Sequence, residues 1–291
     1  MLEQSLASIP APDTVTAKKR YQAEACVAKH VGDRTEQQDR VAVFAHPARK
    51  GTLLAVLADG MGGHSGGAMA AEQVVLKAKQ NFEAFAPASE SPEDLLRGVV
   101  DEAHIVIKLT RFTSEQDPHS TAVVFMMQPD RADWAHCGDS RFYHFRHGKL
   151  VSRSADHSLV EELVRKGRLD AESAARHPNR NVLLSCLGAD REPRVDLGHV
   201  SPLQGGDAFL LCSDGLWEFV DDPAMEHALG GATTPDEWLA ALERLVREAT
   251  RERASHDNFS AVAVWLVEPP ADDVDVGESA GPSAAGDDTS G

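Results

Sequence analysis

The chain has 291 residues, 42% of them hydrophobic, and a formal net charge of -17 at pH 7. This length accommodates one large domain or two small ones, and the acidic balance argues against nucleic acid or an anionic membrane as the main partner. No apolar run is long enough for a transmembrane helix, and the first residues lack the basic and apolar regions of a signal peptide, so we expect a cytoplasmic protein. The four cysteines are scattered without a C-x-x-C pair, which fits a reducing compartment.

Hydrophobic periodicity predicts many short strands and a few long helices. The expected strands cover residues 22–30, 41–45, 52–59, 121–128, 133–138, 141–146, 195–200, 208–212 and 259–267. The expected helices cover residues 68–85, a segment that begins at Ser91, residues 158–166 and residues 234–253. Asp94 closes a capping box with Ser91, and Pro92 suits the first helical position. The links between the first strands are too short for crossover helices, which predicts antiparallel pairing and an α+β layered sandwich.

The two ends of the chain and one internal segment differ from this pattern. Residues 1–21 read as a flexible leader with prolines and no clear period. Residues 268–291 are rich in Pro, Gly, Ala, Ser and acidic side chains, without Lys or Arg, and we expect a disordered acidic tail. A polar stretch within residues 158–190 reads as a surface flap. The catalytic or binding domain should therefore cover residues 22–267.

Three aspartates lie where predicted strands begin or end. Asp59 follows an apolar strand and precedes a glycine-rich loop, Asp214 follows a second apolar strand, and Asp257 precedes the last strand. Three such carboxylates can converge on one edge of a sheet core. Two hard divalent ions that share one carboxylate form a clamp for displacement at phosphorus, and oxygen ligands suit magnesium or manganese. Arg34 is the candidate phosphate ligand, because a guanidinium matches phosphate oxygens bidentately.

With these residues in place, the chain resembles the metal-dependent serine/threonine phosphatases of the type 2C family, in its bacterial form. The resemblance covers residues 22–267 and consists of seven short motifs in the order of the family. The motifs are the segment from Arg34 to Asp39, Asp59-Gly60-Met61-Gly62-Gly63-His64, Ser120-Thr121, Cys137-Gly138-Asp139-Ser140-Arg141, Asp156-His157-Ser158, Cys212-Ser213-Asp214-Gly215-Leu216 and Asp257-Asn258. Each motif alone is weak, but seven in order are specific.

The resemblance implies a four-layer α-β-β-α sandwich of two antiparallel sheets flanked by helix pairs. It implies that Asp59 bridges two Mn²⁺ or Mg²⁺ ions, that the Gly60 carbonyl binds the first, and that Asp214 and Asp257 bind the second. Asp39 would hold a metal-bound water and Arg34 the substrate phosphate. A hydroxide between the ions would then attack the phosphorus of phosphoserine and phosphothreonine directly. The implied protein is a monomer that works against a separate serine/threonine kinase.

The sequence departs from the pattern found in some or most members of the family at three positions. Gln38 stands where the family usually has Glu, which removes a charge near the metals. His119 stands where the small-residue motif usually starts with Gly. Met61 takes the place of a histidine that serves some relatives as leaving-group acid. Asp117 could bind a third ion together with Asp214, although Asp117-Pro118 is equally well explained as a plain turn.

Other residues of the motifs have structural interpretations. We expect Asp139 and Arg141 to pair within a hairpin, and Asp156 and His157 to cap the following helix. His64 could contact the glycine loop or lie exposed. The sequence names no partner for the histidines at positions 136, 144 and 147.

Two alternatives come from other classes of protein. Gly63-His64-Ser65-Gly66-Gly67 is a G-x-S-x-G sequence after a strand and before a helix, which in a serine hydrolase marks the nucleophile Ser65. An elbow serine follows its strand directly, however, whereas Asp59 to Gly62 intervene here, and the strands lack the alternation of a parallel sheet. Gln38 suggests the second alternative, a pseudophosphatase that binds phosphoproteins without turnover.

Overall fold

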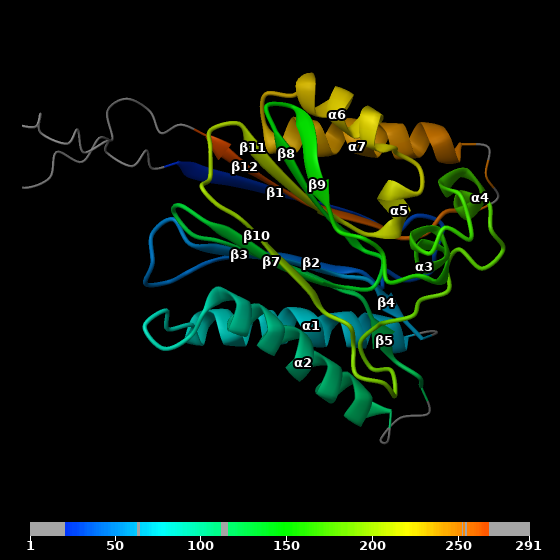
Figure 1. Cartoon of the computed structure of the whole chain (residues 1–291), viewed down its shortest axis with the longest axis horizontal. Helices are drawn as coiled ribbons and strands as arrows, with labels where there is room; N and C mark the ends of the chain where they lie inside the picture. Colours follow the sequence, from blue (N-terminus) through cyan, green and yellow to red (C-terminus); the bar gives the residue numbers. More distant parts are fainter. Residues whose placement is uncertain (1–20, 63–64, 112–115, 252, 254, 268–291) are drawn as a thin grey trace, which may run out of the picture.

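The computed structural model describes residues 21–62, 65–111, 116–251, 253 and 255–267. Residues 1–20 of the leader, His64 and the acidic tail lie outside the described residues, so the interpretations of these segments stay predictions. Tyr21, the last residue of the predicted leader, packs against the core between the sheets. Figure 1 shows two sheets stacked in the middle of the molecule, with a helix pair on each outer face. This is the predicted four-layer order. No helix in the described part of the chain combines the length and apolar character that crossing a bilayer requires.

The first sheet has the strand order β1-β12-β11-β8-β9, and every neighbouring pair is antiparallel. Its strands are β1 (Gln22–His30), β12 (Phe259–Val267), β11 (Asp207–Cys212), β8 (Arg141–Arg146) and β9 (Lys149–Arg153). β9 was not expected, because its sequence KLVSR lies on the sheet edge with mostly exposed side chains. A turn at His147-Gly148 precedes β9, and both residues have positive φ.

The second sheet has the order β10-β7-β6-β3-β2 and is also antiparallel throughout. Its strands are β10 (Asp196–Val200), β7 (Ala132–Cys137), β6 (Ala122–Met127), β3 (Leu53–Ala58) and β2 (Arg40–Ala45). A short ladder, β4 (Gly60–Met61) with β5 (His119–Ser120), extends beyond β3.

Alternation along the strands explains why the layers stack. On β3, Leu54 and Val56 belong to the core under the helices, whereas Ala55 and Leu57 belong to the core between the sheets. All of β3 is buried, so both of its faces need an apolar partner. Phe125, Phe142 and Phe209 fill the space between the sheets.

Helices cover the outer faces. α1 (Ser65–Ala84) and α2 (Pro92–Thr110) cover the second sheet, and α2 begins with the predicted Ser91–Asp94 capping box. α6 (Asp222–Gly230) and α7 (Pro235–Thr250) cover the first sheet, with Trp238 buried between them and the strands. The short α3 (Leu159–Arg165), α4 (Ala171–Ala175) and α5 (Asp214–Trp217) lie near one end of both sheets. α4, α5 and α6 were not predicted.

Candidate metal centre

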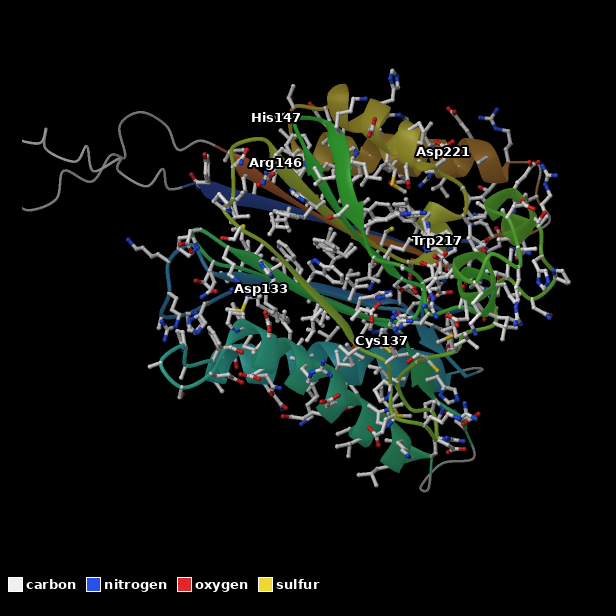
Figure 2. All side chains as sticks on the ribbon, viewed as in Figure 1. Asp133, Cys137, Arg146, His147, Trp217 and Asp221 are labelled. Carbon is white, nitrogen blue, oxygen red and sulfur yellow. The ribbon has the colours of Figure 1, made fainter. Side chains whose placement is uncertain are left out.

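The three strand-end aspartates come together in one open cleft of ≈ 700 Å³. Figure 2 shows β7 running from Asp133 to Cys137 toward the end of the sheets that carries Trp217, away from Arg146 and His147. The cleft lies at the end where β3 and β11 stop. Its lining residues are Arg34, Thr35, Glu36, Gln38, Asp59, Gly60, Met61, Gly62, Asp139, Asn181, Leu183, Asp214, Asp257 and Asn258. Asn181 and Leu183 come from the flap.

The carboxylates of this cleft repel one another. Burial raises the pKa of Asp59 well above its usual range, and Asp39, Asp214 and Asp139 raise it further. Burial and nearby Asp139 and Asp257 likewise raise the pKa of Asp214. Bare carboxylates at these positions therefore stay protonated well above their ordinary range, and bound cations would remove that penalty.

Main-chain and side-chain bonds to Thr121 fix the position of Asp59. The Asp59 amide donates to Thr121 Oγ1 at 2.9 Å, and the Thr121 amide donates to the Asp59 carbonyl at 2.9 Å. The next residue, Gly60, is packed against the first turn of α1, where a Cβ at Gly67 would lie 2.6 Å from the Gly60 carbonyl oxygen. Because Gly67 has no side chain, α1 can pack closely against Gly60, whose carbonyl is predicted to bind a metal ion.

Asp39 lies behind the cleft and is almost fully buried. Ser213 Oγ donates to its Oδ2 at 3.0 Å, and the same oxygen of Ser213 accepts the Ser260 amide at 3.0 Å. Burial raises the pKa of Asp39 to about 6, and the nearby hydroxyls of Ser260 and Ser213 lower it only in part. Ser213 thus connects Asp39 to the strand end that carries Asp214.

Asn258 holds the loop that carries Arg34. Its Oδ1 accepts the Gln38 amide at 2.7 Å, and its Nδ2 donates to the carbonyls of Val31 at 2.7 Å and Glu36 at 3.0 Å. Arg34 lies at the cleft, with 56% of its side chain exposed, and its Nη2 donates to Asp257 Oδ2. The first motif is therefore held in place by the last one.

Asp139 is a cleft residue that the sequence interpretation missed. The expected Asp139–Arg141 pair does not form, because Arg141 instead donates to both oxygens of Asp156 at 2.8 Å. Burial and the neighbouring Asp156 raise the pKa of Asp139 to about 7. A useful signal was available in the sequence, since the Gly138-Asp139 turn follows the end of a strand as Asp59 and Asp214 do.

The structure also shows the contacts of the residues expected to cap α3 and of several histidines. Ser158 caps α3, so the capping role expected of Asp156 and His157 was wrong. His157 Nδ1 accepts the Gly138 amide at 3.3 Å, and His144 Nε2 lies 3.0 Å from Asp207. His136 is fully buried next to His157, and neither of its ring nitrogens has a hydrogen-bond partner among the described residues.

Asp117 lies outside the residues that line the cleft. Arg111 Nε lies 2.6 Å from its Oδ1, and His119 Nε2 lies 3.2 Å from its Oδ2. A third ion at Asp117 would have to displace the Arg111 ion pair. Asp117 as a metal ligand stays a prediction.

The fold opposes the serine-hydrolase alternative. A nucleophile elbow belongs to a parallel sheet of β-α-β units, whereas both large sheets here are antiparallel. Asp214 is also unsuited to be the acid of a catalytic triad, because it lies among the carboxylates of the cleft and the charged groups that act on it most strongly are acidic.

The donor set fits hard divalent cations. The cleft offers carboxylate and carbonyl oxygens, and neither a cysteine nor a histidine is among its lining residues. Oxygen-only sites of this kind select magnesium, calcium or manganese over zinc or copper.

Comparisons with known proteins give the same assignment. Residues 27–258 match the family described as protein phosphatase 2C. The chain is 34% identical over 209 residues to the serine/threonine phosphatase stp of Listeria monocytogenes, covering 70% of this chain and 81% of the relative.

Two solved structures extend the comparison. The serine/threonine phosphatase of S. agalactiae superposes with a TM-score of 0.76 at 29% identity, covering 84% of this chain and all of that one. The catalytic domain of the phosphatase PstP, solved in complex with two manganese ions, gives a TM-score of 0.69 at 26% identity over 84% of this chain and 98% of that one. The chain belongs to the protein phosphatase 2C family and is a metal-dependent serine/threonine phosphatase.

Proposed function

We propose that the acidic cleft hydrolyses phosphoserine and phosphothreonine esters with two Mn²⁺ or Mg²⁺ ions. Asp59 would bridge the ions, the Gly60 carbonyl would bind one, and Asp214 and Asp257 would bind the other. When bound, the two ions activate water as a nucleophile at neutral pH and neutralise charge on the transferring phosphoryl group. The observation that carries the proposal is the convergence of these carboxylates on one cleft, where burial and neighbouring carboxylates raise the pKa of Asp59 and Asp214.

The remaining residues of the site would position water and phosphate. Asp39, held by Ser213, would accept a hydrogen bond from a metal-bound water. Arg34 would leave Asp257 and donate to the substrate phosphate, since its exposed side chain can move at the cleft mouth. Asn258 would keep the Arg34 loop at a fixed height above the strand ends.

Three further features of the site belong to this proposal. Gln38 lines the cleft without a charge, so we expect weaker metal binding than a glutamate would give. A third ion would use Asp117 and Asp214. Met61 also lines the cleft and cannot donate a proton, so another group would have to protonate the leaving group.

The cellular setting follows from the same sequence arguments. We infer that the phosphatase is a monomer in the cytoplasm that opposes a separate serine/threonine kinase. Its catalytic domain would span residues 22–267, between the leader of residues 1–21 and the acidic tail of residues 268–291. Nucleic acid and membranes are not expected partners of so acidic a chain.

The test is hydrolysis of p-nitrophenyl phosphate and of a phosphothreonine peptide with manganese, with magnesium and with EDTA. Activity should require the divalent ion and should resist inhibitors of the okadaic-acid type. Full activity in EDTA would exclude the two-metal proposal. A chain that binds the phosphopeptide with manganese but never releases phosphate would instead be a pseudophosphatase.

A further inference from the structure

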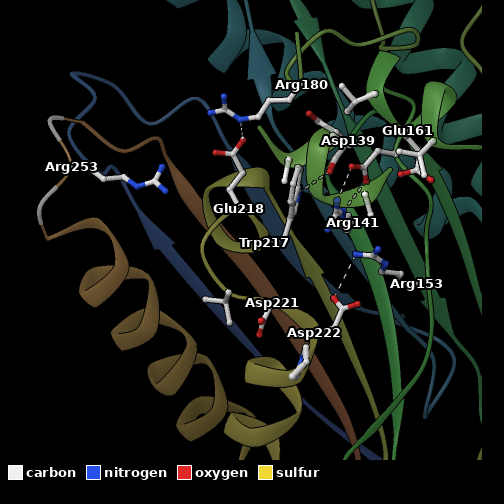
Figure 3. A pocket seen from close by; sticks show the side chains of 18 residues that line it. Asp139, Arg141, Arg153, Glu161, Arg180, Trp217, Glu218, Asp221, Asp222 and Arg253 are labelled. Carbon is white, nitrogen blue, oxygen red and sulfur yellow. Dashed lines mark hydrogen bonds and ion pairs between the residues drawn. The ribbon is translucent and has the colours of Figure 1, made fainter. Parts of the chain in front are cut away.

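A second cavity of ≈ 730 Å³ lies directly beside the metal cleft, and Asp139 lines both. The flap helices α3 and α4 form one side of this cavity, and the segment from α5 into α6 forms the other (Figure 3). We call it the flap pocket. Its volume is within the range of natural ligand sites, so it can receive side chains of a bound peptide.

The charged side chains of the flap pocket are mostly paired with one another. Arg141 binds Asp156 through two hydrogen bonds of 2.8 Å. Arg153 Nη1 lies 3.5 Å from Asp222, and Arg180 Nε lies 3.5 Å from Glu218. These three pairs leave no net charge.

The carboxylates outside these pairs outnumber the cations. Among the described residues, Asp139 and Glu161 make no ion pair, and the carboxylate of Asp221 accepts only the Ala224 amide at 2.9 Å. Arg253 is the remaining cation, and its guanidinium lies 4.6 Å from the ring centre of Phe219. The flap pocket therefore presents an excess of negative charge.

The rest of the wall is apolar and is anchored by Trp217. Trp217 Nε1 donates to the Asp139 carbonyl at 2.9 Å, and the Arg141 guanidinium lies 3.6 Å from its ring centre. Val160 and Val164 from α3 complete this surface. A ligand with a cationic head on an aliphatic stem would satisfy both parts of the wall.

We propose that the flap pocket binds an arginine or lysine side chain of the phosphoprotein substrate, close in sequence to the phosphorylated residue. The inference rests on the proposed function, because the phosphate must occupy the adjoining metal cleft. Because Asp139 lines both cavities, a substrate chain that leaves the cleft past Asp139 would pass directly into the flap pocket. Glu161 and Asp221 would then contact the basic side chain, and Trp217 and Val164 would pack on its stem.

The test compares phosphothreonine peptides that differ only in their flanks. One peptide carries a basic block before the phosphothreonine, one carries it after, one has alanines and one has acidic residues. With saturating manganese, kcat/KM should be higher for at least one basic peptide than for the acidic peptide by about three- to fivefold for each contacting carboxylate. Glu161→Lys and Asp221→Asn should each reduce this ratio, and the asparagine retains the cap of α6.

Glu172→Lys is the matched control. Glu172 lies in the first turn of α4 as Glu161 lies in the first turn of α3, but it does not line the flap pocket. This variant should keep the wild-type ratio. Equal kcat/KM for all flanks, or a ratio that is unchanged in both Glu161→Lys and Asp221→Asn, would overturn the inference. Hydrolysis of p-nitrophenyl phosphate by the wild-type enzyme reports separately on the proposed function.

Discussion

The guanidinium Nη2 of Arg34 lies 2.5 Å from Oδ2 of Asp257, so the proposed phosphate ligand is paired with a proposed metal ligand. The two side chains are 56% and 42% exposed, and solvent therefore screens their attraction. The ion pair therefore competes with metal binding at Asp257 and with phosphate binding at Arg34. Metal binding at Asp257 would release the guanidinium toward the phosphate.

Arg34→Ala should raise KM for a phosphopeptide, with some loss of kcat, while manganese binding becomes tighter by up to about fivefold. The variant loses a phosphate contact and frees Asp257 from its cation. Steady-state kinetics and isothermal titration with manganese measure the two effects. Arg247→Ala serves as the control, because it removes an exposed arginine of α7 that is distant from Arg34 in the sequence. An unchanged kcat/KM would remove Arg34 from the site.

Asp59→Asn should reduce turnover by more than about a hundredfold and weaken manganese binding, without loss of the fold. The amide keeps the size and one oxygen of the side chain but removes the charge shared between the ions. In EDTA the variant should melt at a higher temperature than the wild type, because the buried carboxylates no longer include Asp59. Glu248→Gln on α7 provides the isosteric control. Near-wild-type turnover by Asp59→Asn is the result that the two-metal proposal cannot accommodate.

His136 should make the protein sensitive to acid. Burial, together with the neighbouring His157, lowers its pKa to about 3. The unfolded chain therefore binds a proton below its ordinary pKa of 6.5, whereas the folded chain does not, so stability falls as pH drops below 6.5. Between pH 6.5 and about pH 4.5 this loss amounts to about 2–3 kcal/mol.

His136→Leu should reduce that loss. Urea unfolding at both pH values measures it, and the difference between the two free energies of unfolding should shrink relative to the wild type. Both titrations are done in EDTA, so that metal release does not contribute. An equal acid loss in the variant would assign the sensitivity to other groups, such as His104, whose pKa is also lowered by burial.

Asp156→Asn should destabilise the fold by about 3 kcal/mol, because it leaves the Arg141 guanidinium buried without its charge partner. For a domain of this size the melting temperature should fall by about 6–10 °C. Asp222→Asn removes a carboxylate from the longer and more exposed pair with Arg153 and should cost less than about 1 kcal/mol. Equal shifts in the two variants would contradict this ranking.

A chain that ends after Pro269 should retain its melting temperature and its activity on p-nitrophenyl phosphate. β12 ends at Val267, and the residues after it lack basic and aromatic side chains. Differential scanning fluorimetry of the full and shortened chains gives the comparison. A drop of several degrees would indicate that the acidic tail packs against the domain.

The sequence predicted those elements whose signals are local. The capping box of Ser91 and Asp94 and the strand of residues 259–267 depend on neighbours a few positions away, and both are observed. α5 was missed because it is short and begins within the Asp214 motif. α6 was missed because it is also short and begins soon after that motif. Their burial against β11 and α7 stabilises them more than their own sequence does.

In the candidate site, too, residues with a local sequence signal were predicted and residues placed by tertiary contacts were not. Asp59, Asp214 and Asp257 were identified because each stands at a strand end, a feature visible along the chain. Asp139 also follows a strand end, but its place in the cleft was missed because the sequence suggested that it pairs with Arg141. Arg141 bonds to Asp156, fifteen positions away, instead of to Asp139. The contact forms because β8 and β9 pair as an antiparallel hairpin, and β9 was not predicted from the sequence.

The last strand, β12, lies between the first strand, β1, and β11. During synthesis the second sheet and its two helices can form as soon as residues up to β10 have left the ribosome. β1, however, pairs with β12 alone among the described strands, so it must wait for the final residues of the domain. Asp257 and Asn258 arrive together with that strand. A nascent chain therefore gains its phosphatase site only when translation of the domain is complete.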